Sequence, residues 1–310
     1  MIKLKKILFP SDFGESAEDA LRYAVMLAGE YDAELTMMHV VSIYTDTDSL
    51  AEEHLSDMAK YAEDFTGQRQ QDAHDRIDRA IEAQNLNMKK MIVRGISPYQ
   101  EIVRVAQEED IDLVVMGTYG KGGVTHFLFG STAEQVVRLV DCPVLTVRHQ
   151  APLLGDFSGI RNILFPTDFS DYSKRALPYA LSFAGRYGAT LHVLHVFEQR
   201  VHPSFYIMDK STPFDLDDSL RERALKALDE FVSPDLKDRI SFRCEAASGK
   251  PFVEIINYAR RNEIDLIVIA THGLTGLEYM VIGSTTERVV RKSPCPVLSI
   301  KDPEHEFVKL

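Results

Sequence analysis

One apolar run, followed by a glycine loop and the start of a helix, constrains the fold more than any other stretch of the sequence. The run spans residues 111–116, and the loop after it reads Gly, two residues, Gly, nine residues and then Gly-Ser-Thr, from Gly117 to Thr132. A continuous run of branched apolar residues is typical of a parallel strand buried on both faces. Ser131 with Glu134 three residues later predicts a capping box at the start of the helix. The backbone N–H groups of the loop and the positive end of the helix would then face one point, which suits a phosphate anion.

The second half of the chain contains a near copy of this stretch. The apolar run 264–270 is followed by the same loop spacing, except that Ala270 takes the place of the first Gly. The beginnings of the halves match as well, since Asp168 follows Asp12 by 156 residues, and later equivalent positions are 153 residues apart. A repeat of this length indicates a duplicated domain rather than a solenoid. We therefore expect a first domain at 1–149, a linker at 150–159, a second domain at 160–302 and a C-terminal tail at 303–310.

Strand-like and helix-like patterns alternate within each half. In the first half we expect strands near residues 6–10, 34–41, 88–94, 111–116 and 143–147, and helices over 16–29, 52–85, 98–109 and from 131 onward. Alternation of this kind predicts an α/β fold in which each domain has a parallel sheet.

The composition and charge exclude several classes of protein. The net charge of −12 argues against nonspecific binding to nucleic acids or anionic membranes, because neutralising phosphates requires a basic surface. No apolar stretch is long enough to span a bilayer, and the first residues are too short for the apolar region of a signal peptide, so we expect a cytoplasmic protein. The cysteines, Cys142, Cys244 and Cys295, predict neither a disulfide framework nor a metal-binding pair. No histidines have the spacing of a metal site.

With two copies of the Gly-x2-Gly-x9-Gly-Ser/Thr pattern, complete in the first half and near-complete in the second, the chain resembles the universal stress protein family in its tandem form. The resemblance covers nearly the whole chain. It implies two domains, each an open five-stranded parallel sheet in the order 3-2-1-4-5 with helices on both faces. It also implies binding of ATP or AMP, with Mg²⁺ as an accompanying ion. Strands 1 and 4 would then be adjacent, and ligands bind at the carboxyl ends of such strands in open α/β sheets.

The resemblance also implies which residues bind the nucleotide. In the first domain these are Pro10, Ser11, Asp12, Val40, Met116, Gly117, Gly120, Gly130, Ser131 and Thr132. In the second domain the corresponding residues are Pro166, Thr167, Asp168, Val196, Ile269, Ala270, Gly273, Gly283, Ser284 and Thr285. Lys121 offers a cation for the phosphates, whereas Leu274 holds its place in the second copy. We therefore expect the first site to bind more tightly.

Each of these residues also has a purely structural interpretation. The glycines could serve loop geometry, because glycine adopts backbone conformations that other residues resist. Ser131 and Ser284 could be N-caps, and Asp12 and Asp168 could cap the helices that follow them. His39 and His195, at equivalent strand ends, are expected to be core or hydrogen-bonding residues, and the stretch 202–208 is expected to pack locally.

These patterns favour a stress-response or regulatory module that binds an adenine nucleotide. No Walker A motif is present and no catalytic residue is expected, so weak ATP hydrolysis is an alternative without a sequence motif behind it. A second alternative is an assembly module that works without nucleotide. In that case the two domains would pair within the chain and whole chains could form a homodimer, through the last strands at 144–147 and 297–300.

Overall fold

The computed structural model describes residues 3–42, 88–118, 130–148, 159–198, 213–232, 240–273 and 282–301. The chain divides into two compact units, with the division between Ala151 and Pro152. Four predicted segments lie outside the described residues: the helix expected over 52–85, the linker at 150–159 except for its last residue, the stretch 202–208 and the tail at 303–310.

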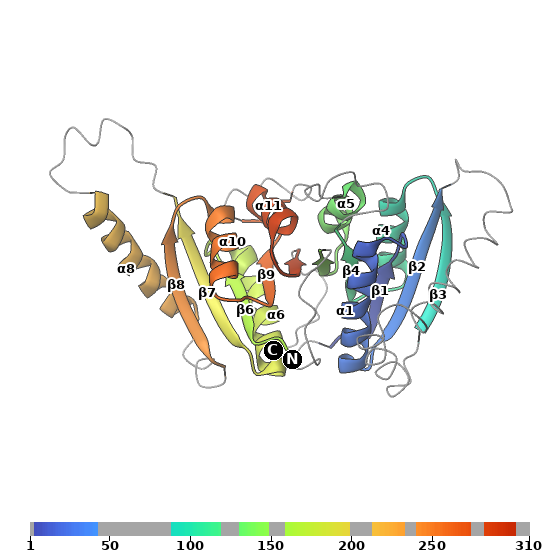
Figure 1. Ribbon diagram of the computed structural model, residues 1–310, viewed down its shortest axis with the longest axis horizontal. Helices are drawn as coiled ribbons and strands as arrows, with labels where there is room; N and C mark the ends of the chain where they lie inside the picture. Colours follow the sequence, from blue (N-terminus) through green and yellow to red (C-terminus); the bar gives the residue numbers. More distant parts are fainter. Residues whose placement is uncertain are drawn as a thin grey trace. The chain divides into compact units, whose positions relative to one another are not determined.

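The first unit is a parallel sheet with helices on both faces (Figure 1). Its elements are β1 (Lys6–Pro10), α1 (Glu15–Tyr31), β2 (Glu34–Ser42), β3 (Met88–Gly95), α4 (Pro98–Glu108), β4 (Leu113–Gly117), α5 (Ser131–Leu139) and β5 (Val144–Val147). The strands pair in parallel in the order β3-β2-β1-β4-β5, so the predicted order is confirmed. Right-handed crossovers place α1 on one face and α4 with α5, which contact each other, on the other.

The second unit repeats this arrangement. Its elements are β6 (Asn162–Pro166), α6 (Asp171–Tyr187), β7 (Thr190–Phe197), α8 (Pro213–Phe231), β8 (Phe242–Ser248), α10 (Pro251–Arg261), β9 (Leu266–Ala270), α11 (Ser284–Lys292) and β10 (Val297–Ile300). The strands are again parallel and follow the order β8-β7-β6-β9-β10. The α/β prediction is therefore confirmed for both halves.

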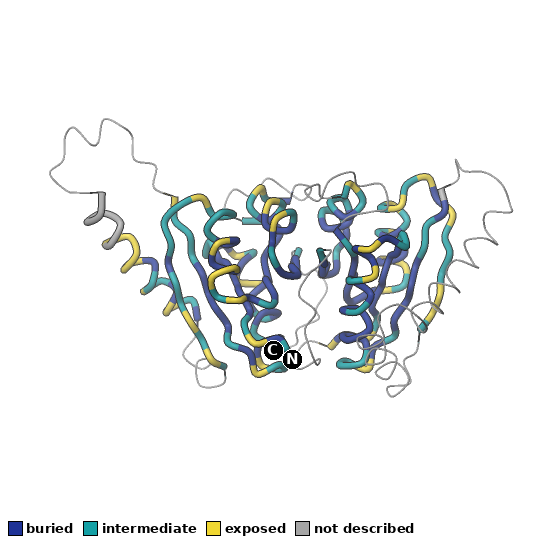
Figure 2. Tube along the Cα trace, in the orientation of Figure 1, coloured by how far each residue is buried: buried dark blue, intermediate teal, exposed yellow. Residues whose placement is uncertain are grey.

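The central strands of each unit consist mostly of buried residues (Figure 2), and most of these are apolar. In β1, Ile7, Leu8 and Phe9 are fully buried, as the sequence pattern of a strand covered on both faces requires. Burial of side chains of this size stabilises the fold by about 1.5–3 kcal/mol each. The two central strands thus form the packed centre of the unit, from whose carboxyl ends the candidate site is built.

In each unit a carboxylate joins the two neighbouring central strands at their amino ends, at the edge of the sheet away from the glycine loop. Asp112, just before β4, accepts hydrogen bonds through Oδ2 from the backbone N–H groups of Lys5 (2.6 Å) and Lys6 (3.0 Å). In the second unit Asp265 accepts in the same way from residues 161 (2.8 Å) and 162 (2.9 Å). This contact aligns β1 with β4 and β6 with β9, and so brings their carboxyl ends side by side.

The predicted capping box at Ser131 is wrong. The N-cap of α5 is Gly130, whose carbonyl accepts the first helical bond from the Glu134 N–H (3.0 Å), and no side chain caps the helix. The same holds for α11, where Gly283 is the N-cap and Ser284 the first helical residue. The N-cap thus lies one residue earlier than predicted, at Gly130, whose N–H is hydrogen-bonded to the Thr118 carbonyl just after β4.

Candidate functional site

A cleft of about 480 Å³ lies where β1, β2 and β4 end in the first unit. The loop after β1, the first turn of α5 and the start of α4 complete its walls. The lining residues are Pro10, Ser11, Asp12, Ala17, Met38, His39, Val40, Pro98, Ile102, Met116, Gly117, Thr118, Gly130, Ser131, Thr132 and Ala133. A volume of this size is within the range of small-molecule sites.

The cleft brings together nine of the ten residues predicted for the first site. The tenth, Gly120, lies outside the described residues, as do Lys121 and its counterpart Leu274. Sequence reasoning missed Thr118 and Ala133, although both directly adjoin residues of the glycine pattern. The contributions of α4 could not be found this way, because they depend on how that helix packs over the strand ends.

The loop between β1 and α1 is held in a strained conformation. Phe13 has a φ of 59°, which is rare for a bulky residue, and its N–H donates to Ser11 Oγ (3.1 Å). Its ring packs against His39 with the centroids 4.7 Å apart. The same geometry recurs in the second unit, where Phe169 has a φ of 63°. Strain of this kind persists only where the surroundings enforce it and is frequent at functional sites.

His39 anchors this loop to β2. Its Nδ1 lies 2.8 Å from the backbone oxygen of Ser11, and since a carbonyl only accepts, Nδ1 carries the proton. His195 makes the same contact with the carbonyl oxygen of Thr167 (2.8 Å). Both histidines are thus hydrogen-bonding residues, as the sequence suggested.

Neither aspartate caps its helix, so that interpretation is wrong. Asp12 Oδ1 accepts from the Gly14 N–H (3.1 Å) in a local turn, and Gly14 itself is the N-cap of α1. In the second unit Ser170 is the N-cap. Because each aspartate lies two residues before the N-cap of its helix, its carboxylate shapes the loop instead, and Asp12 forms part of the cleft wall.

The first turn of α5 presents backbone donors to the cleft. The Gly130 N–H is occupied, since it donates to the Thr118 carbonyl (2.8 Å), and the first bond within the helix comes from the N–H of Glu134. The N–H groups of Ser131, Thr132 and Ala133 therefore have no acceptor within the helix, and all three residues line the cleft. Together with the helix dipole, these groups form a site that favours an anion.

Gly117 is required by helix packing. A Cβ at this position would lie 2.7 Å from the backbone oxygen of Ser16 and 2.6 Å from its Oγ, so α1 leaves no room for one. In the second unit Ala270 takes this position and Tyr172 that of Ser16. The extra methyl of Ala270 therefore points toward α6. At this position the methyl group would not obstruct the approach of a ligand to the strand ends.

The residues predicted for the second site also lie at the corresponding strand ends. Pro166 ends β6, Val196 lies in β7, and Ile269 and Ala270 end β9. Thr167 and Asp168 follow β6, and Gly283, Ser284 and Thr285 begin α11. Asp168 and Gly273 are in close contact, since a Cβ on Gly273 would lie 2.4 Å from Asp168 Oδ2.

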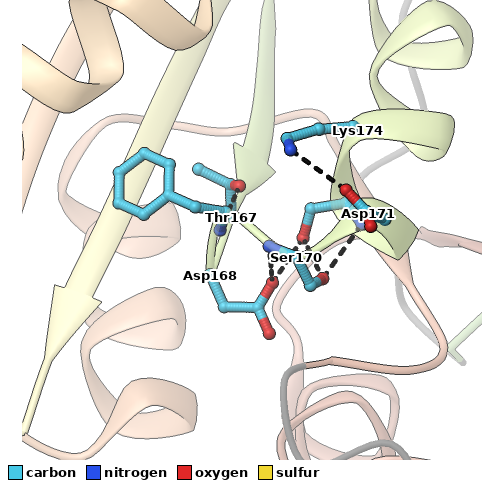
Figure 3. A network of polar contacts seen from close by, with 7 residues as sticks. Thr167, Asp168, Ser170, Asp171 and Lys174 are labelled. Atoms are coloured by element: carbon cyan, nitrogen blue, oxygen red, sulfur yellow. Dashed lines mark hydrogen bonds and ion pairs between the residues drawn. The ribbon is translucent and has the colours of Figure 1, made fainter.

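Hydroxyl groups fix the carboxylate of the second site. Asp168 Oδ1 accepts from the Ser170 N–H (3.0 Å) and from Ser173 Oγ (2.7 Å), as part of the network in Figure 3. Thr286 Oγ1 donates to the carbonyl of Ala270 (2.8 Å). In the first unit, alanines take the places of Ser173 and Thr286, and both line the cleft. At these two positions the second site therefore has hydroxyl hydrogen bonds that the first cannot make.

The described residues do not indicate a nucleophilic cysteine, a metal site or a membrane span. Burial raises the pKa of Cys142 and of Cys295 to about 12, so neither thiol is a ready nucleophile at neutral pH. Within the described ranges, no group of three or more His, Cys, Asp or Glu side chains could hold a metal ion. Among the helices that the structure describes, none combines the length and the apolar character of a membrane span.

Comparison with known proteins gives the same family for both halves. The model of the universal stress protein family matches residues 3–148 and 159–301. A universal stress protein of Methanocaldococcus jannaschii is 32% identical over 146 residues, which cover 47% of this chain and 85% of that protein. A universal stress protein of Methanothermobacter thermautotrophicus is 31% identical over 145 residues, which cover 46% of this chain and 95% of that protein.

Solved structures resemble the whole chain in fold. A universal stress protein from Archaeoglobus fulgidus matches with a TM-score of 0.63 and 22% identity, over 96% of this chain and 98% of that one. A functionally unknown protein from Pseudomonas aeruginosa matches with a TM-score of 0.64 and 19% identity, over 96% of this chain and 92% of its own. At these identities the likeness concerns the fold alone.

Proposed function

Because the chain belongs to the universal stress protein family, we propose that its first domain binds an adenine nucleotide, ATP or AMP, and serves as a regulatory module in a stress response. The observation that carries this proposal is the cleft of about 480 Å³, in which the unpaired N–H groups of the first turn of α5 face the ends of β1 and β4. Occupancy would regulate the protein only if the nucleotide binds two of its states with different affinity.

The parts of the cleft suit the parts of a nucleotide. The first turn of α5 supplies donors and a positive helix end for the phosphates. Val40, Met116 and Ile102 supply apolar surface for the base, and Asp12 supplies a carboxylate that could accept from a ribose hydroxyl. Mg²⁺ would enter with ATP, held mainly by the phosphates and water, as this ion usually is.

The second domain has the same arrangement of strands and loops, but fewer of its features favour nucleotide binding. Its residues are hydrogen-bonded to one another, and the carboxylate of Asp168 lies against the glycine loop at Gly273. A phosphate there would meet a fixed negative charge, which is unfavourable. We therefore propose that the first domain holds the nucleotide and that the second binds it more weakly or not at all.

Substitution of Gly130 by Asp tests the proposal. Gly130 has the extended conformation of an N-cap, with φ −64° and ψ 136°, which suits Asp well. The new carboxylate would cap the free N–H groups of α5 and repel a phosphate, so the affinity for ATP or AMP should fall by about 100-fold or more while the fold is kept. Isothermal titration calorimetry measures the affinity, and thermal unfolding checks the fold.

Gly283→Asp is the matched control. It places the same carboxylate at the N-cap of α11, where the new Cβ would lie 3.3 Å from the backbone oxygen of Thr271, and it should leave binding to the first domain unchanged. If Gly130→Asp binds nucleotide as tightly as the wild-type protein, the phosphates do not lie at α5 and the proposal is refuted.

A further inference from the structure

Thr118 is a buried polar residue of the first cleft whose side chain has no partner. It directly follows β4, lines the cleft and is only 3% exposed. Its hydroxyl oxygen makes no hydrogen bond in the described part of the chain. Buried hydroxyl groups are almost always paired, so each exception requires an explanation, such as a ligand that is not yet bound.

Three hydrogen bonds fix the backbone of Thr118 and so fix the position of its side chain. The N–H donates to the carbonyl of Val147 (3.0 Å) and to Ser16 Oγ (3.1 Å). The carbonyl accepts from the N–H of Gly130 (2.8 Å), directly before the first turn of α5. Thr118 therefore lies directly beside the first turn of α5, which has the free helical donors.

The second unit uses the equivalent threonine differently. Thr271 has the same backbone contacts, with its N–H on the carbonyl of Ile300 (2.8 Å) and its carbonyl on the N–H of Gly283 (2.8 Å). Its Oγ1, however, lies 3.0 Å from Nδ1 of His272 and is hydrogen-bonded to it. The equivalent hydroxyl is therefore satisfied within the protein in one unit and open in the other.

We propose that Thr118 Oγ1 donates a hydrogen bond to a phosphoryl oxygen of the nucleotide in the first cleft. It thereby adds a side-chain donor to the backbone donors of Ser131, Thr132 and Ala133. This inference rests on the proposed nucleotide binding and assigns a new contact within that site. It also gives a physical difference between the clefts, since the Thr271 hydroxyl already has a partner.

The test compares Thr118→Val with Thr118→Ser. Valine has the shape of threonine without the hydroxyl, whereas serine retains it. Both are made in the Gly283→Asp protein, so that only the first cleft is measured, and AMP and adenosine are titrated by calorimetry. We expect the valine variant to bind AMP about tenfold more weakly or worse, because a hydrogen bond to a charged group is lost. Serine should bind AMP nearly as the parent does, and adenosine should bind all three proteins alike.

Thermal unfolding without nucleotide gives a second readout. Thr118→Val should unfold at the same or a higher temperature than the wild-type protein, because it removes an unpaired buried hydroxyl. Thr271→Val should unfold at a lower temperature, because it breaks the bond to His272. A lower unfolding temperature for Thr118→Val would mean that the hydroxyl has an internal partner, and would overturn the inference.

The binding outcomes separate this inference from the proposal on which it rests. If the parent binds AMP and Thr118→Val binds it equally well, the Thr118 contact is refuted and nucleotide binding stands. Equal weakening of AMP and adenosine would also refute it, because the contact would not be with the phosphate. If the wild-type protein binds neither ATP nor AMP, both the proposed function and this inference are wrong.

Discussion

His192 shows how a single residue distinguishes the two units. It lies in β7 of the second unit, where it is only 1% exposed, and the equivalent residue of the first unit is Thr36. Its Nδ1 is 2.9 Å from Tyr258 Oη, and its Nε2 is 3.2 Å from Asn162 Oδ1. Burial, with a smaller contribution from the charge of Arg243, lowers the pKa of His192 to about 4. The neutral imidazole is therefore a built-in part of the core.

This residue should make the stability of the second unit depend on pH. Between about pH 6.5 and pH 4 the unfolded chain binds a proton at His192 that the folded chain does not. The free energy of unfolding should thus fall as the pH falls through this range, by at most about 3 kcal/mol. Urea denaturation at pH 7 and pH 4.5, followed by hydrogen exchange in residues 159–198, measures the change.

His192→Gln is the control for this effect. Glutamine keeps polar atoms near Tyr258 and Asn162 but does not titrate, so the pH dependence of the second unit should become shallower in this range. An equal dependence in the variant and the wild-type protein would assign the effect to other groups.

Residue-level details were the least predictable from the sequence. Phe13 in a left-handed conformation could not be expected, because bulky residues rarely adopt it, and the contact with His39 and the turn around Ser11 stabilise it. The open hydroxyl of Thr118 could not be found either, since nothing in the residue type distinguishes it from Thr271. The conformation of Phe13 depends on His39, which is distant in the chain. The hydrogen bond of Thr271 is with the adjacent His272, and it depends on how the two side chains are oriented after β9.

At the scale of elements, the strands and their order followed from the sequence. The apolar runs and the two glycine loops predicted buried parallel strands, and the resemblance supplied the order. The N-cap of α5 was predicted wrongly, because the sequence pattern allows either Gly130 or Ser131 to be the N-cap. The bond between Gly130 and the Thr118 carbonyl decides between them, and this bond is tertiary.

The contact that aligns the central strands can be tested at this scale. Asp112→Ala should lower the free energy of unfolding of the first unit by about 2 kcal/mol or more, because two backbone N–H groups lose a charged acceptor. Asp112→Asn keeps one acceptor oxygen and should lose less. Urea denaturation, with hydrogen exchange in β1, measures both.

Asp265→Ala provides the matched variant in the second unit. Because its carboxylate accepts from the N–H groups of residues 161 and 162 in the same way, its effect should have a similar size but appear in β6. If Asp112→Ala leaves the stability of the first unit unchanged, the hydrogen bonds before β4 do not hold the strands together.

At the scale of the whole molecule, duplication has produced two units with one topology and different sites. The first has a cleft with an open hydroxyl and alanines in its wall, and the second has serine, threonine and histidine groups that bond to one another. Two identical halves would bind two nucleotides per chain. The differences argue instead for one occupied domain, with the second serving a structural or regulatory role.

Nucleotide content and hydrogen exchange test this division together. Protein purified without added nucleotide and then denatured should release close to one adenine nucleotide per chain, identified by mass spectrometry. ATP at 100 times its dissociation constant should stabilise the domain that binds it by about 2.7 kcal/mol, because binding to the folded state alone shifts unfolding by mass action. The added protection should therefore appear in residues 3–42, 88–118 and 130–148 and be absent from 159–198. Two nucleotides per chain, or equal protection of both units, would show that the internal bonds at Asp168 and Thr271 open readily and that the second domain binds as well.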